Sequence, residues 1–238
     1  LQTLLIAGLQ RSRLSNKRAR KALYKSQKEL EEKDYYLLDQ RQIIFNPQYE
    51  FLVNEYFTIG IGASFKYVNT FPAENTFLSK NNFYTTGRRI YYQVSLNSIY
   101  NSTNHEYAAD SGMYFYFNSF YNPKLRNDHS EFGGIEAELK NYFRFNLIRS
   151  SNFALKIGGK KLWGSFPFYE AAFLGDDNAR GFLRERFAGD AAVYLNAELR
   201  LGLFKHTFLL PYELSLLILG DIGRVFLKEE QSRIWHPS

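Results

Sequence analysis

The stretch that decides the fold is LGDDNARGFLRERFAGDAAVYLNAELRLGL, residues 174–203. It begins as a polar, glycine-bearing loop and continues from residue 191 as a run in which apolar and polar side chains alternate. Successive side chains of a strand point to opposite faces, so one face is apolar and the other carries Glu198 and Arg200. Repeated along a chain at transmembrane length, this alternation predicts an outer-membrane β-barrel, with apolar residues facing lipid and polar residues facing the lumen.

The same alternation recurs in other parts of the chain. It is regular in 57–68, 88–100, 112–121, 133–147 and 153–164. With 1–9, 37–53, 191–204 and 212–226, the turn signals divide the chain into about nine strands. The sequence therefore predicts an all-β, antiparallel transmembrane barrel wall. Residues 1–238 are expected to form part of one barrel domain, with no separate soluble domain.

The predicted connections alternate in length. Short or medium ones lie at 54–56, 101–111, 149–152 and 205–211, and long ones at 10–36, 69–87, 122–132 and 165–190. This pattern is typical of periplasmic turns and extracellular loops. Loop 10–36 starts basic and ends acidic, which favours a solvated loop or short helix. The alternative is a surface whose basic residues bind lipopolysaccharide phosphates or a partner.

Composition excludes several classes of protein. The chain has 238 residues, 18% of them aromatic, and no cysteine, which excludes a disulfide framework and a thiolate metal site. The chain contains no run of about 18 apolar residues, so the sequence predicts no transmembrane helix. The net charge of +6 favours attraction to anionic outer-membrane lipids and lipopolysaccharide. Because no nucleic-acid-binding motif accompanies it, we expect no nucleic-acid partner.

Nine strands do not close a barrel of this kind. Bacterial single-chain barrels have an even number of strands, and an open edge in lipid leaves backbone groups without hydrogen bonds. We therefore expect the chain to be part of a larger polypeptide in the bacterial outer membrane.

Four short motifs resemble the BamA/TamA family of outer-membrane proteins. In chain order they are ARGF (179–182), FAGD (187–190), AELR (197–200) and GDIGRVF (220–226). The resemblance implies a sixteen-strand barrel, of which this chain would hold roughly strands five to thirteen. It also implies that the Arg-Gly-Phe motif lies on the sixth extracellular loop and folds back into the lumen. Soluble periplasmic POTRA domains are usual for the family.

The candidate site is the loop motif Arg180, Gly181 and Phe182. A guanidinium inside a barrel needs a fixed partner, and a carboxylate satisfies it best. Glu198 and Asp221 face the lumen by strand parity, and the resemblance implies that they hold the loop arginine. Gly181 allows close backbone approach, and Phe182 can pack against the wall. The alternative, from the residues alone, is that Arg180 is an ordinary exposed loop arginine.

We predict no catalytic residue, no metal site and no cofactor. The histidines His105, His129, His206 and His236 lie in separate predicted connections without metal-ligand spacing. Asp176 and Asp177 could bind a cation, although a solvated acidic pair is the commoner arrangement. Gly158, Gly159 and Gly164 lack the context of a phosphate-binding loop, and they favour close packing of the folded-in loop or a bend in the strand.

Three functions are compatible with this sequence. The first is assistance in the insertion or assembly of outer-membrane proteins, with other outer-membrane or periplasmic proteins as partners. The second is a membrane anchor for a fused enzyme, a phosphoesterase or patatin-like lipase, because some proteins that resemble this family carry one before the barrel. The third is a two-partner secretion pore. The sequence of the barrel wall does not separate them.

Overall fold

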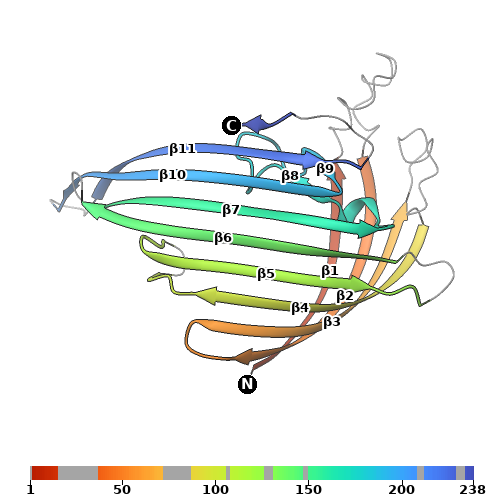
Figure 1. Cartoon of the computed structure of the whole chain (residues 1–238). Helices are drawn as coiled ribbons and strands as arrows, with labels where there is room; N and C mark the ends of the chain where they lie inside the picture. The colour runs from red at the N-terminus through yellow and green to blue at the C-terminus, as the bar shows by residue number, and fades with distance from the viewer. Residues whose placement is uncertain are drawn as a thin grey trace, which may run out of the picture.

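The computed structural model describes residues 2–15, 37–71, 87–105, 108–125, 131–146, 150–207, 212–228 and 234–238. Long antiparallel strands lie side by side and curve into an open section of a barrel (Figure 1). Among these residues, no helix is long and apolar enough to cross a membrane. The all-β antiparallel architecture predicted from the alternation is confirmed.

Nine long strands make up the described wall. They are β1 (Gln2–Ser15), β2 (Leu37–Leu52), β3 (Phe57–Phe71), β4 (Gly87–Asn101), β5 (Gly112–Asn122), β6 (Phe132–Asn146), β7 (Ser150–Gly164), β10 (Ala191–His206) and β11 (Tyr212–Phe226). Each pairs with its neighbour in chain order, and the short strand β12 (His236–Pro237) pairs with β11. The sheet order within the described residues runs from β1 to β12 without the first and last strands pairing.

The connection 165–190 between β7 and β10 has structure of its own. It contains the 3-10 turn η1 (Phe168–Glu170) and a two-stranded sheet of β8 (Ala172–Leu174) and β9 (Phe187–Gly189). The turn 53–56, in contrast, is a tight connection at the opposite end of the strands (Figure 1).

Several predicted boundaries were wrong by a few residues, and one by more. Residues 10–15 belong to β1 and pair with β2 up to Ser15 opposite Leu37, although we expected a loop to begin at residue 10. The polar composition after residue 9 indicated a loop. These residues nevertheless form a strand, because the hydrogen bonds between paired strands join backbone groups and do not depend on side-chain polarity. Residues 16–36, where the lipopolysaccharide-binding alternative would apply, lie outside the described residues.

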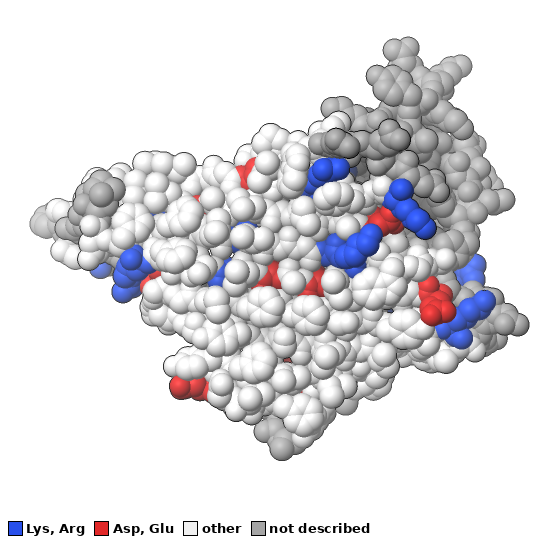
Figure 2. Space-filling view, viewed as in Figure 1, with Lys and Arg blue, Asp and Glu red and all other residues white. Residues whose placement is uncertain are grey.

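The two faces of the wall differ as the alternation predicts. Register places Glu138, Gly158 and Tyr194 in one row on the lumen side of β6, β7 and β10. The large apolar residues of the opposite face are exposed, among them Ile61, Val94, Phe143 and Ile157. On the face seen in Figure 2, uncharged surface predominates and charged side chains are few. An exposed apolar band of this kind is what a lipid-facing wall requires.

Part of the lumen side is apolar, although the alternation predicted a polar lumen face. A buried cluster of wall residues lies near the strand ends that adjoin the loop: Val68, Tyr91, Phe120, Phe132, Leu162 and Ala192. Ala172 of the loop belongs to the same cluster, and Phe166, Tyr169 and Val225 pack against it. We call this set the apolar layer. It gives the loop a surface to bury against, and so it positions the candidate site.

Candidate functional site: the arginine of the folded-in loop

Arg180 of the loop lies against two adjacent strands of the wall and contacts a carboxylate on each. Its Nε donates to Oδ2 of Asp221 at 2.8 Å, and its Nη2 donates to Oδ1 at 2.5 Å. Its backbone N–H also donates to Oδ2 of Asp221 at 2.8 Å. Its Nη1 forms an ion pair with Glu198 of β10. The structure thus brings together the three charged residues that the sequence analysis named.

Burial makes this contact more than a surface ion pair. The side chains of Arg180, Glu198 and Asp221 are 31%, 21% and 2% exposed. A carboxylate as enclosed as that of Asp221 needs a fixed cation or donor, and the planar guanidinium satisfies both of its oxygens. These hydrogen bonds raise the pKa of the Arg180 guanidinium above its ordinary value, so it stays cationic.

The two other motif residues have different surroundings. Gly181 adopts φ +87°, a left-handed conformation that favours glycine, and its backbone lies close to Ser238. Phe182 packs edge-on against Phe187 of β9 and His236 of β12, with centroid distances of 5.3 and 6.0 Å. The Phe182 ring therefore contacts a neighbouring part of its own loop as well as a short strand beside β11.

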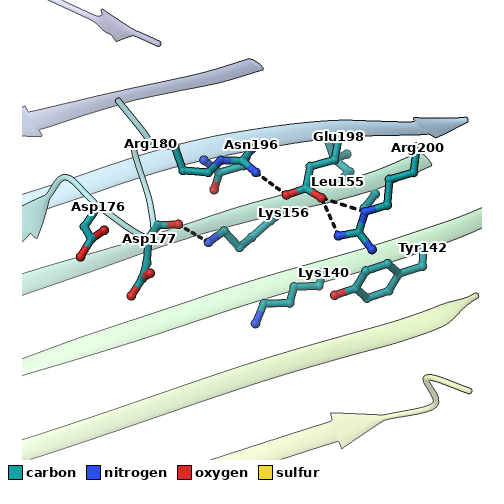
Figure 3. Close-up of a pocket in the computed structure, with 11 residues that line it drawn as sticks. Lys140, Tyr142, Leu155, Lys156, Asp176, Asp177, Arg180, Asn196, Glu198 and Arg200 are labelled. Carbon is teal, nitrogen blue, oxygen red and sulfur yellow. Dashed lines mark hydrogen bonds and ion pairs between the residues drawn. The ribbon is translucent and has the colours of Figure 1, made fainter. Parts of the chain in front are cut away.

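A second line of charges continues from Glu198 along the lumen. Arg200 donates to Oε2 of Glu198 through Nε at 3.1 Å and Nη2 at 2.6 Å. Lys156 of β7 donates to the backbone carbonyl of Asp177 at 2.6 Å (Figure 3). These groups line an open cavity of about 280 Å³ between the loop and strands β6, β7 and β10. Its lining includes both signs of charge.

Two residues of the site were missed by the sequence analysis. Asn178 accepts from the N–H of Gly175 at 2.8 Å and donates to the carbonyl of Phe173 at 3.1 Å, which closes the loop just before Arg180. A Cβ on Gly223 would lie 2.5 Å from Leu174, so this glycine leaves room for the loop. An asparagine in a polar Gly-Asp-Asp-Asn run was an available turn signal. The role of Gly223 depends on a tertiary contact.

The expectations about Gly158, His206 and His236 were wrong. Gly158 makes room for the Tyr194 ring, not for the loop: a Cβ there would lie 2.4 Å from that ring. His206 ends β10 and His236 lies in β12, so neither lies in a connection as expected, while His129 is outside the described residues. Asp176 and Asp177 are exposed. Within the described ranges, no group of three His, Asp or Glu residues is arranged to hold a metal ion.

An antiparallel wall with a lipid-facing band and an inward-folded, arginine-anchored loop defines a class of outer-membrane barrel. A family model described as the Omp85 superfamily domain matches residues 10–235. The chain belongs to the Omp85 superfamily, and its location is the bacterial outer membrane. This family serves the assembly and translocation of outer-membrane proteins.

A solved structure agrees with the family assignment. The chain is similar to BamA from Haemophilus ducreyi, in a crystal structure lacking POTRA domains 1–3, with a TM-score of 0.64 and 14% identity. The similarity covers 81% of this chain and 43% of that one, so this chain spans less than half of the BamA chain. At this identity the match shows the fold alone. A search of curated proteins found no match.

Proposed function

We propose that the full-length protein assists the insertion or assembly of other outer-membrane proteins, with those proteins and periplasmic proteins as its partners. The observation that carries this proposal is the match of the Omp85 model over residues 10–235. The same match supports our inference that residues 1–238 are part of one barrel domain. Outer-membrane lipids and lipopolysaccharide are the proposed surroundings of the exposed apolar band.

In this proposal Arg180, Gly181 and Phe182 lock the loop, with Glu198 and Asp221 as the lumen partners. The role of the lock is structural. It attaches Arg180 of the loop to β10 and to β11, two strands that are already paired with each other, and so holds the loop against this part of the wall. The support for this role is the enclosed ion pair between Arg180 and Asp221.

Depletion of the full-length protein tests the function. We expect the levels of several unrelated outer-membrane barrels to fall together. If those barrels are unaffected and one hydrolase activity disappears, the chain anchors an enzyme. If one secreted protein alone is retained in the cell, the chain is a secretion pore. Either result overturns the proposal.

Complementation tests the lock in the same strain. We expect Arg180→Ala to restore client levels poorly. Arg184→Ala is the matched control, because Arg184 is an exposed arginine of the same loop, four residues away. Equal complementation by the two variants would contradict a role for the lock.

A further inference from the structure

The start of the loop contacts a part of the wall that is far from Arg180. Glu170, the last residue of η1, forms an ion pair with Lys66 of β3 at 2.9 Å between Nζ and Oε1. Lys160 of β7 donates to the backbone carbonyl of Glu170, also at 2.9 Å. In the sheet, β4, β5 and β6 lie between β3 and β7. The loop therefore reaches across the lumen side of four strand intervals to make these contacts.

This contact is enclosed. The side chains of Lys66 and Glu170 are 20% and 18% exposed. Beside them, the ring of Tyr169 meets Tyr91 of β4 edge-on at 6.2 Å, and Pro167 is buried. An ion pair that is screened little by solvent is stronger than a surface pair, and the neighbouring rings exclude water from it. The charged and apolar contacts act at the same place.

The loop is thus attached at two separated points. Arg180 contacts β10 and β11, which lie toward one end of the described sheet, and Glu170 contacts β3, which lies toward the other. A loop that is fixed to the wall at two points resists an increase in the distance between those points. A loop fixed to the wall only at Arg180 would leave β3 free to move relative to β10 and β11.

We propose that Lys66 and Glu170 form a second anchor, which positions the first half of loop 165–190 independently of Arg180 and couples β3–β4 to β10–β11. The proposal deepens the role given above to the loop and rests on that proposed function for its biological consequence. The contact itself requires no client protein. Lys66 and Glu170 are positioning residues in this account.

Thiol labelling of the full-length protein in lipid vesicles tests the second anchor, since this chain contributes no cysteine of its own. Ala172→Cys reports on the loop beside Glu170, and Ala179→Cys reports beside Arg180, because both alanines are fully buried. We expect Glu170→Gln to speed maleimide labelling at position 172 by roughly tenfold, since a buried thiol reacts through local opening. Labelling at 179 stays slow. Arg180→Ala should give the reverse pattern.

Charge exchange separates an ion pair from a general packing effect. We expect Lys66→Glu to speed labelling at 172, and Lys66→Glu combined with Glu170→Lys to slow it again. Lys161→Gln is the matched control, because Lys161 is an exposed lysine next to Lys160 on the other face of β7. If Ala172→Cys does not fold, Ala171→Cys, also buried, replaces it.

Two results would overturn the second anchor. One is unchanged labelling at 172 in Glu170→Gln. The other is an equal increase at both reporter positions, which would mean that the loop opens as a single unit. Neither result depends on client assembly. Failure of the depletion experiment would therefore leave this test intact, and failure of this test would leave the proposed function intact.

Discussion

The two ends of loop 165–190 are held by different kinds of contact. At Arg180, one guanidinium satisfies two carboxylates on adjacent strands, in a geometry that few other side chains could reproduce. At Glu170, a single ion pair lies beside the apolar layer, where several strands contribute buried side chains. The first contact depends on direction and charge. The second combines one ion pair with buried apolar area, and the buried area tolerates changes in shape better.

The difference has a consequence for stability. Removing one partner of an enclosed ion pair leaves the other charge without compensation, so the cost is concentrated in one residue. Removing one side chain from the apolar layer costs its transfer free energy and leaves a cavity, and the neighbouring residues share the loss. Single substitutions should therefore be more damaging at Arg180 than at most positions of the apolar layer.

The largest expected effect is at the Arg180 anchor. We expect Arg180→Ala to lower the free energy of unfolding by about 3–5 kcal/mol, because the enclosed Asp221 loses its cation and keeps only neutral hydrogen-bond donors such as the backbone N–H of residue 180. Arg180→Lys should recover only part of this loss, since lysine keeps the charge but lacks the planar fork. Urea unfolding of the full-length protein in vesicles measures both. Equal stability of Arg180→Lys and the unmodified protein would show that charge alone holds this end of the loop.

A cavity in the apolar layer should have a somewhat smaller effect. Leu162 is 1% exposed and Ile157, on the other face of the same strand, is 44% exposed. We expect Leu162→Ala to cost about 2–4 kcal/mol in the free energy of unfolding, through lost burial and a residual cavity. Ile157→Ala, measured in the same vesicles, is the control and should cost less, because it leaves no enclosed cavity. The comparison between the two ends of the loop fails if Leu162→Ala is more damaging than Arg180→Ala.

The Arg180 end was accessible from the sequence in two steps. Parity within two strands places Glu198 and Asp221 on the lumen side, and the resemblance to the BamA/TamA family implied that they hold Arg180, which from the residues alone could also have been an exposed loop arginine. The same parity argument gave the two faces of the wall, because side-chain alternation is a property of each strand by itself. The assignment of the two faces needed no knowledge of which distant segments meet, whereas the partners of Arg180 were implied by the resemblance.

The Glu170 end was not accessible from the sequence, because its contacts join segments that are far apart in the chain. Lys66 and Glu170 are 104 residues apart, and nothing near either residue indicates the other. The apolar layer breaks the alternation at positions such as Phe120 and Leu162, where an apolar residue on the lumen side stands next to an aromatic residue on the other. That break was a usable signal of lumen-side packing. Which part of the loop covers it depends on tertiary structure.

On the lumen side of the wall, Tyr194 of β10 contacts the two neighbouring strands β7 and β6. The ring of Tyr194 lies over Gly158, and its hydroxyl donates to Glu138 at 2.6 Å. We expect Gly158→Val to cost about 1–3 kcal/mol in the free energy of unfolding, because the new side chain displaces that ring. The control is Gly220→Val in β11, where a Cβ would meet no atom within 4 Å. Similar costs at the two glycines would show that strand propensity, not the Tyr194 contact, sets the effect.

The smallest effect concerns an ion pair outside both anchors. Arg144 at the end of β6 pairs with Asp110 of the 102–111 turn, and its hydrogen bond holds the pKa of Asp110 below the ordinary value of 3.8. A folded-state pKa that is lowered stabilises the fold above the unfolded pKa, and the gain is lost as pH falls through the folded value. Arg144 is half exposed, so solvent screening keeps the gain under about 1 kcal/mol.

The measurement is the difference in unfolding free energy between the unmodified protein and Arg144→Gln. We expect a small deficit in the variant at pH 7 that shrinks steadily below about pH 4, as Asp110 is protonated in both folded and unfolded states. Lys124→Gln, at an exposed lysine just after β5, should show no such trend. A deficit that persists unchanged at pH 2 would mean that Arg144 stabilises the wall by packing.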